Sequence, residues 1–346
     1  MKKINIVFII NTPTAYQVDF FNELKNIANI HIFFLSKKYH NYNFDIKKFK
    51  HFSILQDDLK SKDKIVNFIK KNNTDFVILG GYKIFEIKFI RNINTNIKIL
   101  MWLERFNNDE ILKSIIRYIY LKIHLKKIDA VLAVGHEAKK YYKNFISKVF
   151  YFPYSININK FRILRKKERI VNFLFIGQFI ERKGINLIIK SFKKIIDKSK
   201  LCNFNLTFVG NGPLKEKITN FSKKYKNVHV FPFQNFNKLK KILKKNNVLL
   251  VPSLYDGWAV VGAEAMASSM SLVISDKCGF ARNYKNNIKG FVIRNNMQSL
   301  VRAINYYINN NDIVLEHGKS NFKFAKISQF NTKNSSKALI QNLKKI

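Results

Sequence analysis

The sequence predicts an α/β protein with two domains, each a parallel β-sheet covered by helices. Short apolar runs, typical of strands buried on both faces, alternate with stretches of helical periodicity in two consecutive series. Alternation of this kind indicates strand–helix–strand units, in which the strands pair in parallel. The length agrees, because 346 residues suffice for two domains of ordinary size.

The first series starts with the apolar run 4–10, which ends in a polar turn at residues 11–16. A helical pattern with Val18, Phe21 and Leu24 follows this turn. Further strand-like runs cover residues 30–35, 76–79, 97–102, 130–134 and 148–152. Residues 153–169 are polar and basic without clear periodicity and predict a linker, so we expect the first domain to comprise residues 1–158.

One predicted helix of the first series, residues 110–127, is strongly amphipathic. Its apolar residues share one face: Leu112, Ile115, Ile116, Ile119 and Ile123. Its basic residues lie largely elsewhere on the helix. Packing of the apolar face against the sheet explains this pattern, and binding of the helix to an anionic membrane surface is the alternative.

The second series predicts a second domain over residues 159–328. Its strand-like runs cover residues 172–176, 206–209, 228–231, 248–251 and 291–293, and one more strand ends before Asp276. Helical patterns lie between the strands and continue from Ser299 onward. The last segment, residues 329–346, is a final helix with an apolar face of Ala338, Leu339 and Leu343.

The stretch 248–276 predicts a strand, a polar turn, a helix of small residues and a second strand. Asp256 and Gly257 supply the turn chemistry, and small side chains let the helix lie close to a sheet or a ligand. The first-turn N–H groups and the positive dipole end of such a helix suit a diphosphate. Asp256 and Glu264 are spaced to bracket one ligand, whereas an ordinary strand–turn–helix unit is the alternative.

A second turn of interest, residues 177–184, follows the strand 172–176 and contains Gln178, Arg182 and Lys183. A diphosphate leaving group gains negative charge as its bond breaks. Fixed cations in this turn would therefore stabilise the transition state more than the ground state. A solvated basic turn is the other interpretation.

A third turn, Gly210–Leu214, contains two of the three glycines of a dinucleotide-binding fingerprint. Lys215 occupies the third position, and no acidic ribose ligand follows at the right distance. A nicotinamide-dependent dehydrogenase is therefore a poor fit.

The chain is strongly basic, with 63 Lys and Arg against 22 Asp and Glu and a formal net charge of +41. Such a charge attracts polyanions, anionic lipids and phosphorylated substrates. Lys, Asn and Ile are abundant along the whole chain, so we expect much of this charge to be solvated surface. A basic nucleic-acid-binding protein is suggested by the charge alone, and without a recognition motif we expect no nucleic-acid partner.

No signal peptide and no membrane-spanning stretch is apparent in the sequence. Cys202 and Cys278 have no metal or redox spacing and fit a reducing cytoplasm. No Asp-x-Asp pair or His cluster predicts a metal site. We expect a cytoplasmic protein, free or peripheral on the inner face of the membrane.

The acidic stretch resembles a known signature. An acid, seven residues and a second acid followed by Ala265–Met266–Ala267 resembles the motif of retaining glycosyltransferases of the GT-B fold, family 4, also called glycosyl transferases group 1. The basic turn and the Gly210–Leu214 run resemble two further landmarks of that family, in the expected order. Asp256 stands where the family usually has Glu, and Gln178 where it has Arg, a charge that we expect Arg182 to restore.

The resemblance implies two Rossmann-like domains facing across a cleft, with the donor on the second domain and the acceptor on the first. It implies that Asp256, Lys183 and Arg182 are catalytic and that Glu264 binds the ribose of the donor. The other donor-binding residues would be Gly257, Trp258, Ala259, Val260, Gly177, Gln178, Gly210, Gly212 and Phe233. The acceptor or sugar side would include Tyr16, Glu104 and His136. Burial is the competing explanation for Phe233, and helix capping or solvation for His136.

The activity implied is transfer of a sugar from a nucleoside diphosphate sugar to a hydroxyl of a glycan or lipid-linked acceptor, with retention of configuration. The sugar nucleotide would be a co-substrate, and no metal or other cofactor is expected. Synthesis of capsule, lipopolysaccharide or another cell-surface polysaccharide would be the setting. The resemblance also implies that residues 329–346 cross back to the first domain. A sugar-nucleotide epimerase of the same fold is the alternative activity.

Overall fold

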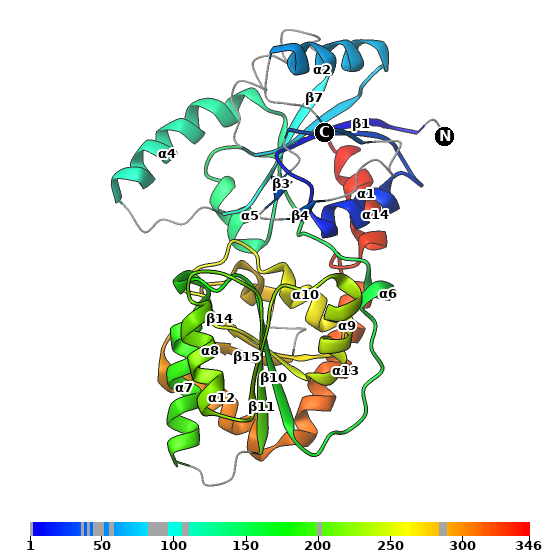
Figure 1. Cartoon of the computed structure of the whole chain (residues 1–346). Coiled ribbons are helices and arrows are strands. Elements are labelled where there is room, and N and C mark those ends of the chain that lie inside the picture. Colours follow the sequence, from blue (N-terminus) through cyan, green and yellow to red (C-terminus); the bar gives the residue numbers. More distant parts are fainter. Residues whose placement is uncertain are drawn as a thin grey trace. The chain divides into compact units, whose positions relative to one another are not determined.

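The protein is described by a computed structural model covering residues 3–35, 38–39, 42–43, 52–54, 59–81, 96–105, 111–198, 203–283 and 289–346. Side chains are not described for 38–39, 42–43, 52–54, 59–62 and 111–113. The chain divides into two compact units (Figure 1). Unit 1 comprises Met1–Asn157 and Gln329–Ile346, and unit 2 comprises Ile158–Ser328.

Unit 1 contains a seven-stranded sheet whose paired strands are all parallel, in the order β5-β2-β1-β6-β7-β8-β9. The strands are β1 (Asn5–Ile10), β2 (Asn29–Phe34), β5 (Phe52–Ile54), β6 (Phe76–Gly80), β7 (Lys98–Leu103), β8 (Ala130–Ala133) and β9 (Val149–Tyr151). A separate antiparallel pair joins β3 (Lys38–Tyr39) to β4 (Tyr42–Asn43). β1 is buried from Ile6 to Ile10, as a central strand covered on both faces must be.

Helices cover both faces of this sheet. They are α1 (Ala15–Leu24), α2 (Leu59–Lys71), α4 (Ile111–His124), α5 (His136–Tyr142) and α14 (Thr332–Leu343), with a 3₁₀ turn η2 (Leu125–Lys127). One apolar core contains side chains from the strands β1, β6, β7 and β8, from the helices α2, α4 and α5, and from η2. On the other face Phe8 contacts Phe21 of α1, and α1 packs against α14 (Figure 1). The backbone of Ile156 also pairs with that of Asn331, so the last segment of the chain belongs to unit 1.

Unit 2 contains a six-stranded parallel sheet in the order β12-β11-β10-β13-β14-β15. Its strands are β10 (Val171–Ile176), β11 (Phe204–Val209), β12 (Val228–Phe231), β13 (Val248–Val251), β14 (Ser271–Ser275) and β15 (Gly290–Ile293). Its helices are α6 (Ile158–Phe161), η3 (Glu181–Lys183), α7 (Ile185–Lys198), α8 (Lys215–Lys224), α9 (Phe236–Lys245), α10 (Val260–Ala267), η4 (Gly279–Asn283), α12 (Met297–Asn309) and α13 (Asn311–Ile327). Figure 1 shows α7, α8 and α12 on one face of the sheet and α9, α10 and α13 on the other.

The order of the strands determines where a ligand can bind. In unit 2 the chain runs outward from β10 through β11 to β12, then crosses to β13 on the other side of β10. The turns after β10 and β13 therefore lead to opposite faces of the sheet, and the carboxyl edge between them is the usual ligand position in such sheets. β1 and β6 have the same relation in unit 1.

The predicted α/β class with parallel sheets is confirmed, and the strand at 248–251 has the predicted bounds. β5 and the β3–β4 pair were not predicted. Cys202 lies outside the described residues.

The packing interpretation of the amphipathic helix is wrong. Ile115, Ile116, Ile119 and Ile123 of α4 are 52, 60, 53 and 52% exposed. The side chain of Leu112 lies outside the described part of the chain. The helix instead packs through its opposite face, where Leu121 is fully buried in the core of unit 1.

Candidate functional site

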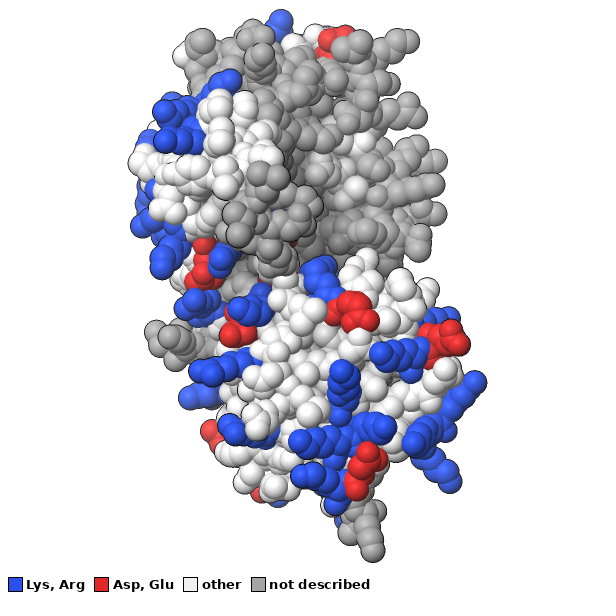
Figure 2. Space-filling model, turned by 90° about the vertical axis from the view of Figure 1, so that its left-hand side faces the viewer, with Lys and Arg blue, Asp and Glu red and all other residues white. Residues whose placement is uncertain are grey.

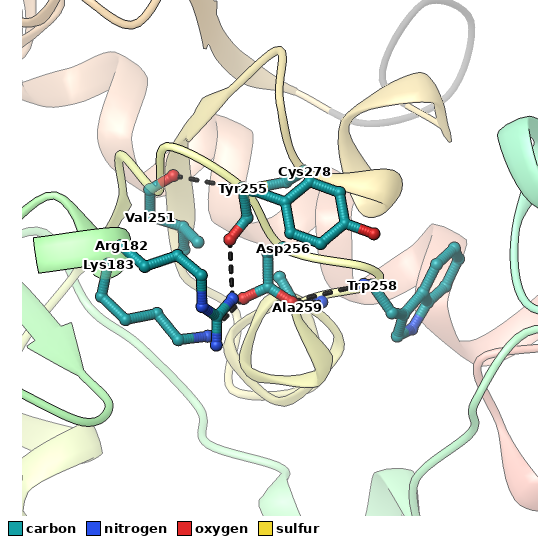
Figure 3. A network of polar contacts seen from close by, with 8 residues as sticks. All are labelled: Arg182, Lys183, Val251, Tyr255, Asp256, Trp258, Ala259 and Cys278. Carbon is teal, nitrogen blue, oxygen red and sulfur yellow. Dashed lines mark hydrogen bonds and ion pairs between the residues drawn. The ribbon is translucent and has the colours of Figure 1, made fainter. Parts of the chain in front are cut away.

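The two turns predicted to bind the diphosphate meet at the carboxyl edge of the unit 2 sheet. Lys183 Nζ, in the turn after β10, donates to Asp256 Oδ2 in the turn after β13 at 2.5 Å. The two side chains are only 21 and 13% exposed, so this ion pair is partly shielded from water. Figure 3 shows Lys183 and Arg182 reaching from their turn toward the Asp256 turn.

Backbone contacts hold the same two turns together. The Leu254 N–H donates to the Arg182 carbonyl at 2.8 Å, and Arg182 Nη1 donates to the Tyr255 carbonyl at 2.7 Å. Arg182 thus links to the acidic turn through both its backbone and its side chain. Its position is fixed by these bonds although the residue is exposed.

Gly184 makes this close approach geometrically possible. Its φ of +78° lies in the left-handed region, which L-residues other than glycine rarely adopt. A Cβ at this position would lie 2.1 Å from the Pro252 carbonyl oxygen. The glycine therefore serves the contact between the turns as well as the start of α7.

Asp256 also caps the approach to α10. Its Oδ1 accepts from the N–H groups of Ala259 at 2.9 Å and Trp258 at 3.3 Å (Figure 3). The Asp256 carbonyl accepts from Gly279 N at 2.9 Å. One carboxylate thus connects the cation of the basic turn with the loop that enters the helix, and its position is fixed on several sides.

The helix α10 packs closely because its side chains are small. Ala263, Ala265, Met266 and Ala267 are fully buried, and a Cβ on Gly262 would lie 2.9 Å from the ring of Phe280. Glu264 is only partly buried and lies one turn beyond Val260, where the helix begins. Positions four apart share a helix face, so Glu264 lies on the face that carries Val260.

The run Gly210–Leu214 supports the basic turn from the side. Asn211 O accepts from Phe179 N at 2.8 Å, and Phe179 O accepts from Leu214 N at 2.9 Å. A Cβ on Gly210 would lie 1.9 Å from the Gly177 carbonyl oxygen. The close packing of these loops therefore requires Gly210, and Phe179 is completely buried between them.

The remaining predicted donor-side residues lie at the same edge of the sheet. Gly177 and Gln178 follow β10 directly, and Gln178 is exposed. Phe233 follows β12 and is 51% exposed. The competing explanation of Phe233 as a buried aromatic is therefore wrong. Trp258, by contrast, is 1% exposed and packs edge-on against Phe280.

In unit 1, two of the three predicted acceptor-side residues come together at Tyr154. The ring of Tyr16 lies 4.8 Å from that of Tyr154, and both Tyr16 and Glu104 form side-chain hydrogen bonds with Tyr154. Burial, followed by the negative charge of Glu104, raises the pKa of Tyr154 well above its usual value. Tyr154 thus stays a neutral phenol.

His136 has a different aromatic neighbour, Tyr151. His136 begins α5, and its ring stacks on Tyr151 at 4.4 Å between centroids. Burial and the nearby Lys139 lower the pKa of His136, so the imidazole is neutral near pH 7.

Three residues around the sites were missed in the sequence: Phe179, Cys278 and Tyr154. Burial raises the pKa of the Cys278 thiol, and Asp256 raises it further, so the thiol is not ionised. Its Sγ lies 3.8 Å from the Val251 carbonyl (Figure 3). In the sequence, the only signal for Phe179 was its position within the glycine-containing turn 177–184. Within the described ranges no three His, Cys, Asp or Glu side chains gather as metal ligands.

Both turns and α10 fall within a region shared with a known family. Residues 157–324 match the family model described as Glycosyl transferases group 1. The matched region covers almost all of unit 2.

Individual proteins are similar over comparable lengths. The uncharacterized glycosyltransferase MJ1178 of Methanocaldococcus jannaschii is 28% identical over 156 residues, 44% of this chain and 42% of that protein. The O-antigen chain mannosyltransferase RfbU of Salmonella typhimurium is 28% identical over 177 residues, 49% of this chain and 48% of that protein. The chain therefore spans about half or less of the length of these two relatives.

Similarity of structure extends over the whole chain. The crystal structure of Anabaena Alr3699/HepE in complex with UDP-glucose superposes with a TM-score of 0.76 over 99% of this chain and 100% of that one, at 10% identity. Together with the two parallel sheets, this likeness confirms the predicted GT-B fold.

Proposed function

We propose that the protein is a retaining glycosyltransferase of family 4 that transfers a sugar from a nucleoside diphosphate sugar to a hydroxyl acceptor. The observation that carries this proposal is the contact between Lys183 and Asp256 across the switch point of the unit 2 sheet. It brings a cationic turn, a carboxylate and a helix amino terminus together where α/β sheets bind ligands. The group 1 match over residues 157–324 supports the same activity.

The geometry suggests how the donor would be held. Lys183 and Arg182, with the amino-terminal N–H groups of α10, would bind the diphosphate, and Glu264 would accept hydrogen bonds from the ribose. Gly177, Gln178, Gly210 and Gly212 form or support the basic turn, and Phe233 is exposed for contact with the base. Gly257, Trp258, Ala259 and Val260 form the entry to α10.

Asp256 would have a role in positioning the transferred sugar. A diphosphate approaching Lys183 would compete with Asp256 for the ammonium group. The carboxylate would then accept hydrogen bonds from sugar hydroxyls near the anomeric carbon.

The cations would act mainly on the transition state. As the bond to the anomeric carbon breaks, negative charge grows on the diphosphate, and fixed positive groups stabilise it without reorganisation. We propose that Lys183 and Arg182 supply this charge in place of a metal ion, and that a diphosphate oxygen takes the proton of the acceptor hydroxyl. The acceptor would attack from the side of the departing diphosphate, which retains the configuration.

The acceptor class is proposed from the relatives and from unit 1. RfbU is named as an O-antigen chain mannosyltransferase, which favours a glycan or lipid-linked acceptor in the synthesis of lipopolysaccharide or another cell-surface polysaccharide. Tyr16, Glu104 and His136, at the carboxyl ends of unit 1 strands, would contact the acceptor or the sugar.

Among the described helices none has the length and apolarity to span a membrane. We propose that the enzyme works on the cytoplasmic side of the membrane.

The test is a transfer assay on the purified protein with a panel of nucleoside diphosphate sugars and glycan acceptors. We expect one donor to support transfer, and Glu264→Ala to lower kcat/KM at least about 100-fold, because a ribose hydrogen-bond acceptor within the donor site is lost. Glu316→Ala, on α13, is the matched control with unchanged activity. Unchanged transfer in Glu264→Ala would refute the proposed site, and isomerisation of the donor without acceptor would indicate an epimerase instead.

A further inference from the structure

The outer face of α4 is the most concentrated apolar surface in the described residues. Five of the fourteen exposed large apolar side chains lie on this one helix: Ile115, Ile116, Tyr118, Ile119 and Ile123. Single exposed apolar residues are ordinary, whereas a contiguous group of them marks an interaction surface. We refer to these five side chains as the α4 apolar face.

The helix is anchored to unit 1 by its other side. Leu121 and Leu125 are 0 and 1% exposed and belong to the core cluster. Ser114 Oγ and His124 Nδ1 are buried there, and neither has a hydrogen-bond partner among the residues that the structure describes. The inward side of the helix thus holds two polar atoms beside the leucines, while four isoleucines face outward, an arrangement that burial against the sheet alone would not favour.

The surface beside this face is basic. Residues 111–128 contain five basic side chains and no acidic one. Lys122, Lys126 and Lys127 are exposed alongside the apolar face. Figure 2 views the side on which α4 lies in Figure 1, and in its upper left Lys and Arg side chains border uncharged surface.

We propose that α4 binds to the surface of an anionic lipid bilayer and lies parallel to it. The α4 apolar face would insert at the boundary between headgroups and acyl chains, and the lysines would contact the lipid phosphates. A basic helix with one apolar face is suited to this position, and both interactions add to the affinity. The helix has 14 residues, too few to cross the bilayer, so it lies on the surface. Two copies of the chain pairing through this face would bring like charges together, which disfavours a homodimer.

The experiment is co-sedimentation of the purified chain with vesicles of phosphatidylcholine alone and with about one third phosphatidylglycerol. We expect binding to the anionic vesicles only. Ile115→Ser/Ile119→Ser/Ile123→Ser should lower the partition coefficient about tenfold or more, because the inserted apolar area is lost. These side chains are exposed, so the variant should fold, and its circular dichroism checks this.

Two matched controls separate the helix from the overall charge. Leu164→Ser/Ile327→Ser removes apolar side chains that are 82 and 76% exposed elsewhere. Lys238→Gln/Lys241→Gln/Lys244→Gln removes three exposed lysines of α9. We expect the first control to bind anionic vesicles as the wild type does. The second control is matched to Lys122→Gln/Lys126→Gln/Lys127→Gln, which removes three lysines beside the α4 apolar face, and we expect the control to bind more tightly than that variant.

A fluorescence measurement reports on insertion directly. Ile119→Trp should show a blue-shifted emission with anionic vesicles and quenching by brominated acyl chains, relative to the wild-type signal. The proposal is overturned if the wild type does not bind anionic vesicles, or if Ile115→Ser/Ile119→Ser/Ile123→Ser binds them as tightly as the wild type. It is also overturned if sedimentation velocity shows a dimer that depends on α4.

Discussion

The Lys183–Asp256 ion pair is the residue-scale feature on which the proposed donor site depends. With side-chain exposures of 21 and 13%, it is shielded enough for its geometry to be well defined. Breaking a shielded pair leaves one charge without its partner, which is costly. In the proposed function both charges would keep a partner, because the diphosphate would replace Asp256 at Lys183 and sugar hydroxyls would replace Lys183 at Asp256.

Protonation of a half-buried histidine should make unit 2 sensitive to acid. Burial lowers the pKa of His317, whose Nδ1 lies 3.0 Å from the hydroxyl of the buried Tyr307. Below about pH 6.5 the unfolded chain therefore binds the proton more readily than the folded one. The stability contributed by the neutral imidazole is present above that pH and is lost as the pH falls through the folded-state pKa.

Denaturant unfolding at pH 7.5 and 5.5 measures this effect. We expect the free energy of unfolding of the wild type to fall on acidification, and to fall less in His317→Gln. His124 and His136 also have lowered pKa values, but they are the same in both proteins and cancel in the comparison. An equal fall in the two proteins would contradict the assignment to His317.

At the scale of elements, the contact between the two turns depends on Gly184. Gly184→Ala combines a left-handed φ with a Cβ 2.1 Å from the Pro252 carbonyl. We expect a loss of about 2 kcal/mol or more in the free energy of unfolding, since backbone strain and overpacking act together. Chemical denaturation measures this loss. The control is Lys193→Ala, on the exposed side of α7, whose free energy of unfolding should stay within about 0.5 kcal/mol of the wild type. A variant as stable as the wild type would mean that the turns separate easily.

The elements of the sheets could be predicted because parallel strands are buried on both faces and form continuous apolar runs. Val248–Val251 is fully buried and was predicted at its observed bounds. β5 is only three residues long, too short for such a run to be recognised. The outward orientation of α4 could not be predicted, because periodicity shows that a helix has an apolar face without showing what that face contacts.

At the scale of the whole molecule, the strand order explains why distant motifs meet. Lys183 and Asp256 are far apart in the sequence but follow strands that pair directly, at Phe173–Val248 and Leu174–Leu249. The sequence identified these two residues by their chemistry and by resemblance. It did not reveal supporting residues such as Phe179 and Tyr154, because a buried aromatic has no chemical signature until the packing is known. The assigned roles of the site residues remain predictions.

The central claim is that the turns after β10 and β13 bind the diphosphate of a sugar nucleotide. Titration calorimetry tests this claim most directly. The wild type is titrated with the common nucleoside diphosphates, and then with the nucleoside monophosphate that has the same base as the diphosphate that binds most tightly. We expect the diphosphate to bind more tightly, and Lys183→Met to weaken diphosphate binding about tenfold or more while monophosphate binding changes little. Lys193→Met should match the wild type. Equal affinity of Lys183→Met and the wild type for the diphosphate would contradict the account.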